Sequence, residues 1–259
     1  MRKKIFLALS ALIMVTMVIT GCSSNTNNLT KEKGTLTIGL EGTYAPYSYR
    51  EGSKLKGFEV DYGKAVAKKL NMKVKFVPTK WDSLIAGLNT NTFDTVINNV
   101  SINKNRESHY LFSTPYIYSK SVIIVPADST IKSATDLKGV KVAEGTGTDN
   151  YDKAEKFQAD IISSPDFSST MSMLDNGRIK ATINSKEAFL TWKKSNPETT
   201  LKYIEIPDSQ LKSSKIAPMF NKKSAKLSSK VTEATKELYK DGTMKKLSIK
   251  YFGEDITKK

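Results

Sequence analysis

The sequence has few of the residues from which catalytic and metal centres are usually built. Cys22 is the only cysteine and His109 the only histidine among 259 residues. One cysteine excludes an intrachain disulfide and a thiolate zinc site, and one histidine excludes a cluster of histidine metal ligands. His109 is the only histidine that a Ser/His/Asp triad could use. The sequence also contains no Walker or Rossmann glycine pattern for binding a nucleotide. We therefore expect no cofactor and no metal.

The N-terminal stretch has the pattern of an export signal. Basic residues at 2–4 are followed by an apolar run over residues 5–19, too short for a spanning helix. The order Ile-Thr-Gly-Cys that ends at Cys22 resembles the bacterial lipobox, in which the cysteine is lipidated and becomes the mature N-terminus. We expect residues 1–21 to be a lipoprotein signal peptide and Cys22 to anchor the chain to the extracytoplasmic face of the cell membrane. An ordinary cleaved signal with an incidental cysteine is the alternative.

Acidic residues are too few to balance the basic ones. Residues 1–21 hold three of the 41 lysines and arginines and none of the 26 acidic residues, so the remainder carries a net charge of +12. A basic excess can indicate nucleic-acid binding, but the lysines are scattered over the whole length without an arginine-rich block or a nucleic-acid motif. We interpret them as a solvated surface facing an anionic envelope, and expect no nucleic-acid partner.

The rest of the chain divides into a polar leader and a regular alternation of strands and helices. Residues 22–33 contain almost nothing apolar and predict a flexible tether. From Gly34 on, apolar periodicity predicts an α/β fold with helices on both faces of the sheet. The expected strands cover 35–40, 74–77, 93–97, 121–125, 140–143 and 179–183, and the expected helices include 81–88, 150–157, 186–194, 225–240 and 244–252.

The alternation starts afresh after residue 120, which indicates two lobes. We expect residues 34–120 and 218–259 to form lobe 1 and residues 121–217 to form lobe 2. The chain would then cross twice between the lobes, and two crossings make a hinge. Ligands in open α/β sheets bind beyond the carboxyl ends of the strands.

One stretch, Trp81 to Arg106, combines the features of a small anion site. A helix and a buried strand are followed by Asn98, Asn99 and Ser101, and we interpret the remainder as a polar loop that ends at Arg106. A fork-shaped cation among small hydrogen-bonding groups is suited to a carboxylate. An ordinary surface cation is the alternative for Arg106.

Other candidates lie at neighbouring strand ends. Glycine-rich residues 145–148 stand between a strand and a helix, where free backbone amides could hold a carboxylate, although a plain turn is the alternative. Trp81 could belong to the core or form a pocket wall with Tyr44. Glu41 and Asp94 could act as an acid/base pair, but Asp94 fits better as the cap of a turn.

Several short motifs occur together in one order. From about Leu36 to Phe252 the chain resembles the bacterial extracellular solute-binding proteins of family 3, the polar amino-acid receptors of ABC importers. The resemblance implies a two-lobed periplasmic-binding-protein-like fold with a two-strand hinge and a ligand cleft between the lobes. It rests on the motifs at residues 41–46, 57–61, 81–84, 93–94, 99–106, 112–116, 136–139, 145–146, 177–178, 241–243 and 251–253.

The resemblance also implies a ligand site built from two aromatic walls, polar strand ends, one cation and contacts from the opposite lobe. These are Tyr44 and Trp81 for the walls, Asn98, Asn99 and Ser101 for polar contacts, Arg106 for the carboxylate, Thr146 or Gly147 for a backbone contact, and Glu41 for the ligand side chain. Ser185 departs from the pattern, because the family usually has an aspartate there for the ligand's α-ammonium. Glu41 or Asp149 would then supply the anion, or the ligand lacks that ammonium.

The function implied is that of a monomeric, lipid-anchored receptor that delivers an amino acid to an ABC permease in the membrane. Motifs such as Trp81-Asp82-Ser83 and Phe252-Gly253-Glu254-Asp255 are most similar to the cystine-binding branch, while histidine-, glutamine- and arginine-type ligands stay open. Two alternatives on the same fold are a periplasmic dehydratase-like enzyme and a sensory or adhesive lipoprotein.

Overall fold

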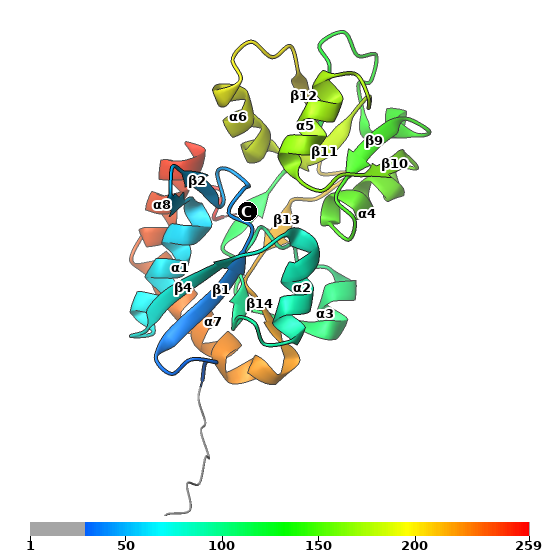
Figure 1. Cartoon of the computed structure of the whole chain (residues 1–259). Coiled ribbons are helices and arrows are strands. Elements are labelled where there is room, and N and C mark those ends of the chain that lie inside the picture. The colour runs from blue at the N-terminus through cyan, green and yellow to red at the C-terminus, as the bar shows by residue number, and fades with distance from the viewer. Residues whose placement is uncertain (1–28, 259) are drawn as a thin grey trace, which may run out of the picture.

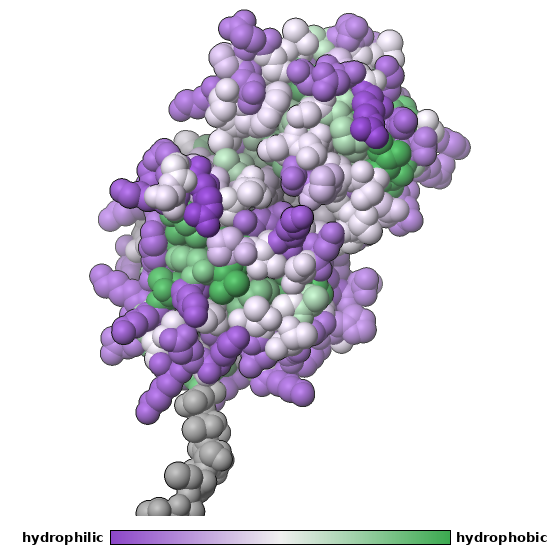
Figure 2. Space-filling model, viewed as in Figure 1, coloured by the Kyte–Doolittle hydropathy of each residue, from purple (hydrophilic) through white to green (hydrophobic). Residues whose placement is uncertain are grey.

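The computed structural model describes residues 29–258. The expected signal peptide and Cys22 lie outside the described residues. The described chain forms two lobes, one above the other in Figure 1, with strands running between them. Hydrophilic residues are spread over both lobes in Figure 2, and hydrophobic ones form small separate areas. No helix within residues 29–258 is long and apolar enough to cross a membrane.

Lobe 1 is a five-stranded sheet of mixed direction with helices packed on it. The strand order is β4-β1-β5-β14-β6, in which β1 runs parallel to β4 and β5, and β14 runs antiparallel to β5 and β6. A small hairpin, β2 with β3, precedes the first helix. The elements are β1 (Thr35–Leu40), β2 (Tyr49–Glu51), β3 (Lys54–Lys56), α1 (Phe58–Lys69), β4 (Lys73–Pro78), α2 (Trp81–Asn89), β5 (Thr95–Val96), α3 (Lys104–His109), β6 (Tyr110–Phe112), β14 (Met219–Asn221), the 3-10 helix η2 (Lys222–Ser224), α7 (Ala225–Lys240) and α8 (Thr243–Phe252).

Lobe 2 has a sheet built from an antiparallel and a parallel part. Strand β8 runs antiparallel to β11 and β12, β9 runs parallel to β10, and a bridge between Val142 and Ala181 joins the two parts. The elements are β8 (Ser121–Val125), the 3-10 helix η1 (Ala134–Leu137), β9 (Lys141–Glu144), α4 (Asp149–Lys156), β10 (Asp160–Ser163), α5 (Phe167–Asp175), β11 (Thr182–Ser185), α6 (Lys186–Ser195) and β12 (Lys202–Glu205).

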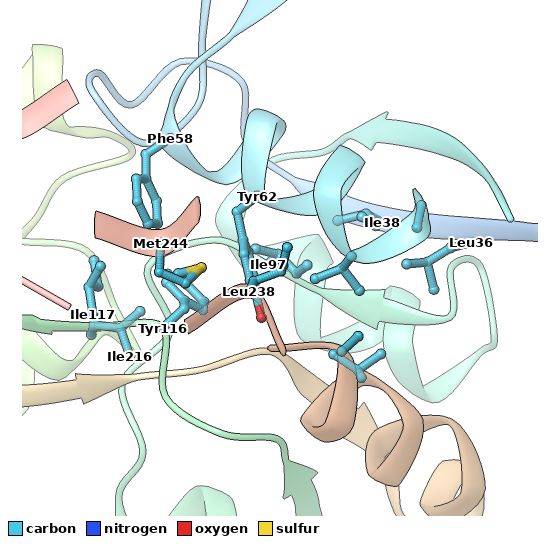
Figure 3. Packing of buried hydrophobic residues seen from close by; sticks show 14 of the residues in the cluster. Leu36, Ile38, Phe58, Tyr62, Ile97, Tyr116, Ile117, Ile216, Leu238 and Met244 are labelled. Carbon is cyan, nitrogen blue, oxygen red and sulfur yellow. The ribbon is translucent and has the colours of Figure 1, made fainter. Parts of the chain in front are cut away.

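The two chain crossings form a hinge of paired strands. Strands β7 (Ile117–Ser119) and β13 (Ser214–Ile216) are antiparallel partners between the lobes. Figure 3 shows Ile117 and Ile216 near Tyr116 and Met244, at one end of the lobe 1 core. The predicted two-lobed α/β fold with a two-strand hinge is thereby confirmed.

The first described residues are held against lobe 1. Thr30 is buried, and the Lys31 amide donates to the Asp94 carboxylate at 2.6 Å. The second carboxylate oxygen of Asp94 accepts from the Thr37 amide at 2.7 Å. Residues 29–33, which their composition assigned to the flexible tether, therefore belong to lobe 1. The Asp94 carboxylate thus joins segments 63 and 57 residues away in sequence. It neither caps a local turn, as its position suggested, nor pairs with Glu41.

Two expected elements differ in the structure. Arg106 lies in the short helix α3, whereas the polar composition of Asn98 to Arg106 predicted a loop; Asn103 caps this helix by accepting from the Arg106 amide at 2.8 Å. The strand expected over 179–183 is instead β11, Thr182–Ser185, because its pairing runs from Thr182 opposite Ile124 to Ser185 opposite Ser121. Local apolar periodicity predicts neither the short polar helix α3 nor the exact limits of β11.

Candidate ligand site

A cavity of about 120 Å³ lies between the lobes. Its lining includes eight of the ten residues that sequence analysis assigned to a ligand site. The exceptions are Thr146 and Gly147, whose neighbours Gly145 and Thr148 line the cavity in their place. The eight are Glu41, Tyr44, Trp81, Asn98, Asn99, Ser101 and Arg106 from lobe 1, and Ser185 from lobe 2.

Arg106 is a buried cation with unused donors. Its side chain is 8% exposed, and Nη1 donates to the carbonyl and the hydroxyl of Ser101, both at 2.9 Å. Nη2 donates to the carbonyl oxygen of Gly147 at 3.0 Å. Burial lowers the pKa of Arg106, although the charges of Asp149 and Asp152 oppose this. Within residues 29–258 no carboxylate lies in ion-pair range of Arg106, so the guanidinium can receive an anion.

Trp81 connects the two lobes beside this cation. It opens α2, and the Arg106 guanidinium carbon lies 5.5 Å from the centre of its ring. The indole Nε1 donates to the carbonyl oxygen of Thr146 at 3.1 Å. Thr146 and Gly147 thus contact lobe 1 through their carbonyl groups, whereas the sequence directed attention to the amides of this loop.

Tyr44 spans the cleft from the other side. Its hydroxyl donates to Asn184 Oδ1 at 2.5 Å and lies 3.3 Å from Ser185 Oγ. Its ring contacts those of Tyr47 and Phe167, with centroids 5.1 Å and 5.6 Å away. Burial raises the pKa of Tyr44, so the neutral hydroxyl is the form present. Tyr44 therefore forms a wall of the cavity that is fixed by both lobes.

Glu41 and Asn98 form a reciprocal pair at the end of two neighbouring strands. The Glu41 amide donates to Asn98 Oδ1, and Asn98 Nδ2 donates to Glu41 Oε2, both at 2.7 Å. Burial raises the pKa of Glu41; the Asn98 hydrogen bond opposes this, and the charges of Asp166 and Asp82 add to it. Because the Asn98 side chain binds Glu41 through Oε2, Oε1 can accept a hydrogen bond from a ligand.

Asp149, the other anion considered for a ligand ammonium, already has a cation. It forms an ion pair with Lys153, and Ser214 donates to it at 3.0 Å. Burial alone would raise the pKa of Asp149, but the Lys153 ammonium and its hydrogen bonds lower it overall. Lys153 also donates to Ser121 and Ser214, at 2.8 Å and 2.9 Å. Because Lys153 already neutralises Asp149, Glu41 is the better candidate partner for a ligand ammonium.

Ser185 presents a neutral group where the resemblance implied a charged one. It ends β11 and caps α6, with Oγ accepting from the Ala188 amide at 3.4 Å. Its own amide donates to Asn184 Oδ1 at 2.8 Å. Lobe 2 thus offers amide and hydroxyl groups at this point of the cavity.

Sequence reasoning missed Glu144 as a lining residue. It ends β9, is 2% exposed, and accepts from the Ile183 amide at 2.6 Å and the Thr182 hydroxyl at 3.0 Å. Burial raises the pKa of Glu144 to about 8. The available signal was its position directly after the strand expected over residues 140–143, as Glu41 directly follows the strand expected over residues 35–40.

Two lobes, a hinge of two strands and a polar cavity bridged by hydrogen bonds define a two-lobed ligand-binding receptor. With residues 36–254 matched, the chain belongs to the bacterial extracellular solute-binding proteins, family 3. It is 36% identical over 270 residues to the L-cystine-binding protein TcyA of Bacillus subtilis (strain 168), a match covering 97% of this chain and 99% of TcyA. The protein is thus a solute-binding receptor and not an enzyme, which removes the dehydratase-like alternative.

Two solved structures differ in how well they superpose. One comes from work on glutathione import by way of GshT and the cystine ABC importer TcyBC of Streptococcus mutans; it is 29% identical with a TM-score of 0.81, covering 87% of this chain and 97% of its own. The L-cystine solute receptor of Neisseria gonorrhoeae, in its unliganded open conformation, is 35% identical, but its TM-score is 0.61, with 90% and 98% covered. In the present structure direct hydrogen bonds join the lobes, from Tyr44 to Asn184, from Trp81 to Thr146 and from Arg106 to Gly147.

Proposed function

We propose that this protein is the substrate-binding receptor of an amino-acid ABC importer and that its ligand is a polar amino acid or a small derivative of one. The observation that carries the proposal is Arg106, a buried guanidinium in the cavity wall without a carboxylate partner in residues 29–258. A ligand carboxylate would receive the free donors of this fork, and charge-assisted hydrogen bonds contribute about 1.5–3 kcal/mol each.

The cation of the ligand would be received by Glu41. Asn98 orients the Glu41 carboxylate toward the cavity, while Lys153 already neutralises Asp149. Ser185 and Asn184 would then contact the ligand through neutral hydrogen bonds. Tyr44 and Trp81 would enclose it from two sides, since both reach across to lobe 2.

Titration calorimetry over a ligand panel tests this function. The panel contains L-cystine, glutathione, L-arginine, L-histidine and L-glutamine, each with its N-acetylated form where one exists. We expect one compound to bind much more tightly than the others, with cystine favoured because of the likeness to TcyA. N-acetylation should weaken binding if Glu41 receives the ammonium. Absence of binding across the panel would contradict the amino-acid assignment and favour a sensory or adhesive role.

We also propose that Cys22 carries a lipid that keeps the receptor on the extracytoplasmic face of the membrane, beside the permease. The support is the Ile-Thr-Gly-Cys order after a basic and apolar leader. Expression of the Cys22→Ala variant in a bacterial host should move the protein from the membrane fraction to the soluble extracytoplasmic fraction and abolish incorporation of labelled palmitate. Retention of label in this variant would contradict the anchor. The predicted monomeric state can be measured on the soluble form by light scattering.

A further inference from the structure

Glu59 is a buried carboxylate that the ligand contacts described above do not use. It is the second residue of α1 and is 0% exposed. Its Oε1 accepts from the Asn99 amide and from the Tyr116 hydroxyl, both at 2.5 Å. Its Oε2 is buried without a hydrogen-bond partner among the described residues, and no basic side chain there lies in ion-pair range. A carboxylate in this position is costly to bury, so its presence there calls for an explanation.

The contacts of Glu59 join three segments that build the site. Its backbone amide donates to the Tyr47 carbonyl at 3.0 Å, which holds the loop that carries Glu41 and Tyr44. Its carboxylate holds Asn99, whose backbone has φ +46°, in the left-handed region that few residues other than glycine adopt. Asn99 lines the cavity, as do the two other polar residues of this segment, Asn98 and Ser101.

The third segment leads to the hinge. Tyr116 immediately precedes β7, and its amide donates to the carbonyl of Ile216 in β13 at 2.8 Å. The Tyr116 hydroxyl is bound to the same oxygen of Glu59 as the Asn99 amide. One carboxylate oxygen thus connects a cavity-lining turn with the place where both hinge strands meet lobe 1.

We infer that Glu59 is a positioning residue, which fixes the Asn98–Ser101 turn relative to Tyr116 and the hinge in the arrangement that receives the ligand. The effect on affinity rests on the ligand site proposed above, while the effect on the turn does not. An ionised carboxylate accepts stronger hydrogen bonds than a neutral one, so the ionised form of Glu59 holds the turn more firmly.

The surroundings of Glu59 make ionisation of its carboxyl group costly. Burial raises its pKa to about 7, partly offset by the Tyr116 and Asn99 hydrogen bonds and increased by the charge of Glu41. The titratable groups facing it are Tyr116, Glu41 and, packed on the Tyr116 ring, Tyr62. Because the folded-state pKa is raised, the folded protein keeps this proton to higher pH than the unfolded chain. The contribution of Glu59 to the free energy of unfolding therefore falls as pH rises from about 4.5 to about 7 and then stays at the lower level.

The Glu59→Gln variant separates positioning from structure, because glutamine keeps the shape and an acceptor oxygen but loses the charge. We expect the variant to melt at a higher temperature than the wild type at pH 8, with a difference that shrinks toward pH 5. We expect its affinity for the tightest member of the ligand panel to fall about tenfold at pH 8. The wild-type affinity should rise between pH 6 and pH 8, and the variant should lose most of that rise. A structural role would instead lower melting temperature and affinity together.

Amide NMR of the protein without added ligand gives a second readout. The Asn99 amide resonance should titrate near pH 7 in the wild type and not in Glu59→Gln. Glu187→Gln is the matched control, because Glu187 is also buried with a raised pKa but accepts from Tyr47 and Ser119 instead of the turn. It should leave the Asn99 titration unchanged.

The outcomes distinguish this inference from the proposed function. If no panel compound binds the wild type, the function is wrong, and the Asn99 titration still decides whether Glu59 holds the turn. If a compound binds but Glu59→Gln changes neither its affinity nor the pH profile, the positioning role is overturned. The positioning role is also overturned if the Asn99 amide resonance titrates in the same way in the wild type and in Glu59→Gln.

Discussion

Replacement of Arg106 by alanine should reduce ligand affinity about 100-fold or more. The guanidinium has donors left over after its bonds to Ser101 and Gly147, and two charge-assisted hydrogen bonds to a ligand carboxylate amount to at least about 3 kcal/mol. The Gly147 contact also joins the lobes, so its loss should add to the effect. Calorimetry with the tightest panel compound measures the change.

Two variants make the result specific. Arg178→Ala removes an exposed arginine of lobe 2 and should leave affinity unchanged. Arg106→Lys keeps the positive charge but not the planar fork, so its affinity should lie between wild type and Arg106→Ala. Affinity within threefold of wild type for Arg106→Ala would exclude this residue as the carboxylate clamp.

Gly57→Ala should lower the melting temperature by about 5–15 °C. Gly57 precedes α1 with φ +129°, and a Cβ there would lie 2.1 Å from the Tyr47 carbonyl oxygen. The variant must either shift the loop that bears Tyr44 or break the bonds from Phe58 and Glu59 to Pro46 and Tyr47. Backbone strain and overpacking each cost about 1–3 kcal/mol, and 1 kcal/mol corresponds to about 2–4 °C in a chain of this size. Circular dichroism melting measures it.

Gly139→Ala is the matched control for Gly57→Ala. Gly139 also has a positive φ, +68°, but a Cβ at this position would meet nothing within 4 Å. Its substitution should therefore cost only the backbone strain, a smaller drop in melting temperature. Equal drops for the two variants would mean that close approach to Tyr47 is not what requires glycine at residue 57.

Local periodicity predicted the long elements of this fold accurately. The helix expected over 225–240 is α7 with those limits, and the strand expected over 35–40 is β1. Strands β10 and β12 were not anticipated, since their residues are half-exposed and their positions depend on pairing with β9 and β8. Short polar segments carry no periodic signal, which is why the helix around Arg106 was also missed. The exact limits of the lobes and the monomeric state stay predictions.

The candidate site was predictable to the extent that it follows strand ends. Glu41 directly follows β1, and Asn98 and Ser101 lie two and five residues beyond the end of β5, so the topology of the sheet brings these strand-end segments together. What they bond to is decided by packing between segments far apart in sequence. The pairing of Asp149 with Lys153 was readable as an i, i+4 pair on a helix, whereas the bond from Glu59 to Asn99 was not, because 40 residues separate the two.

The hydrogen bond between the Lys31 amide and Asp94 limits how far lobe 1 can lie from a membrane anchor at Cys22. If a lipid on Cys22 holds the chain at the membrane, only nine residue steps separate that anchor from the point where the chain is fastened to lobe 1. A fully extended chain of this length spans about 30 Å. The end of lobe 1 that carries Asp94 could then never move farther than this from the lipid surface, while lobe 2 would be restrained only through the hinge. Opening and closing would thus be a motion of lobe 2 against a lobe kept near the membrane.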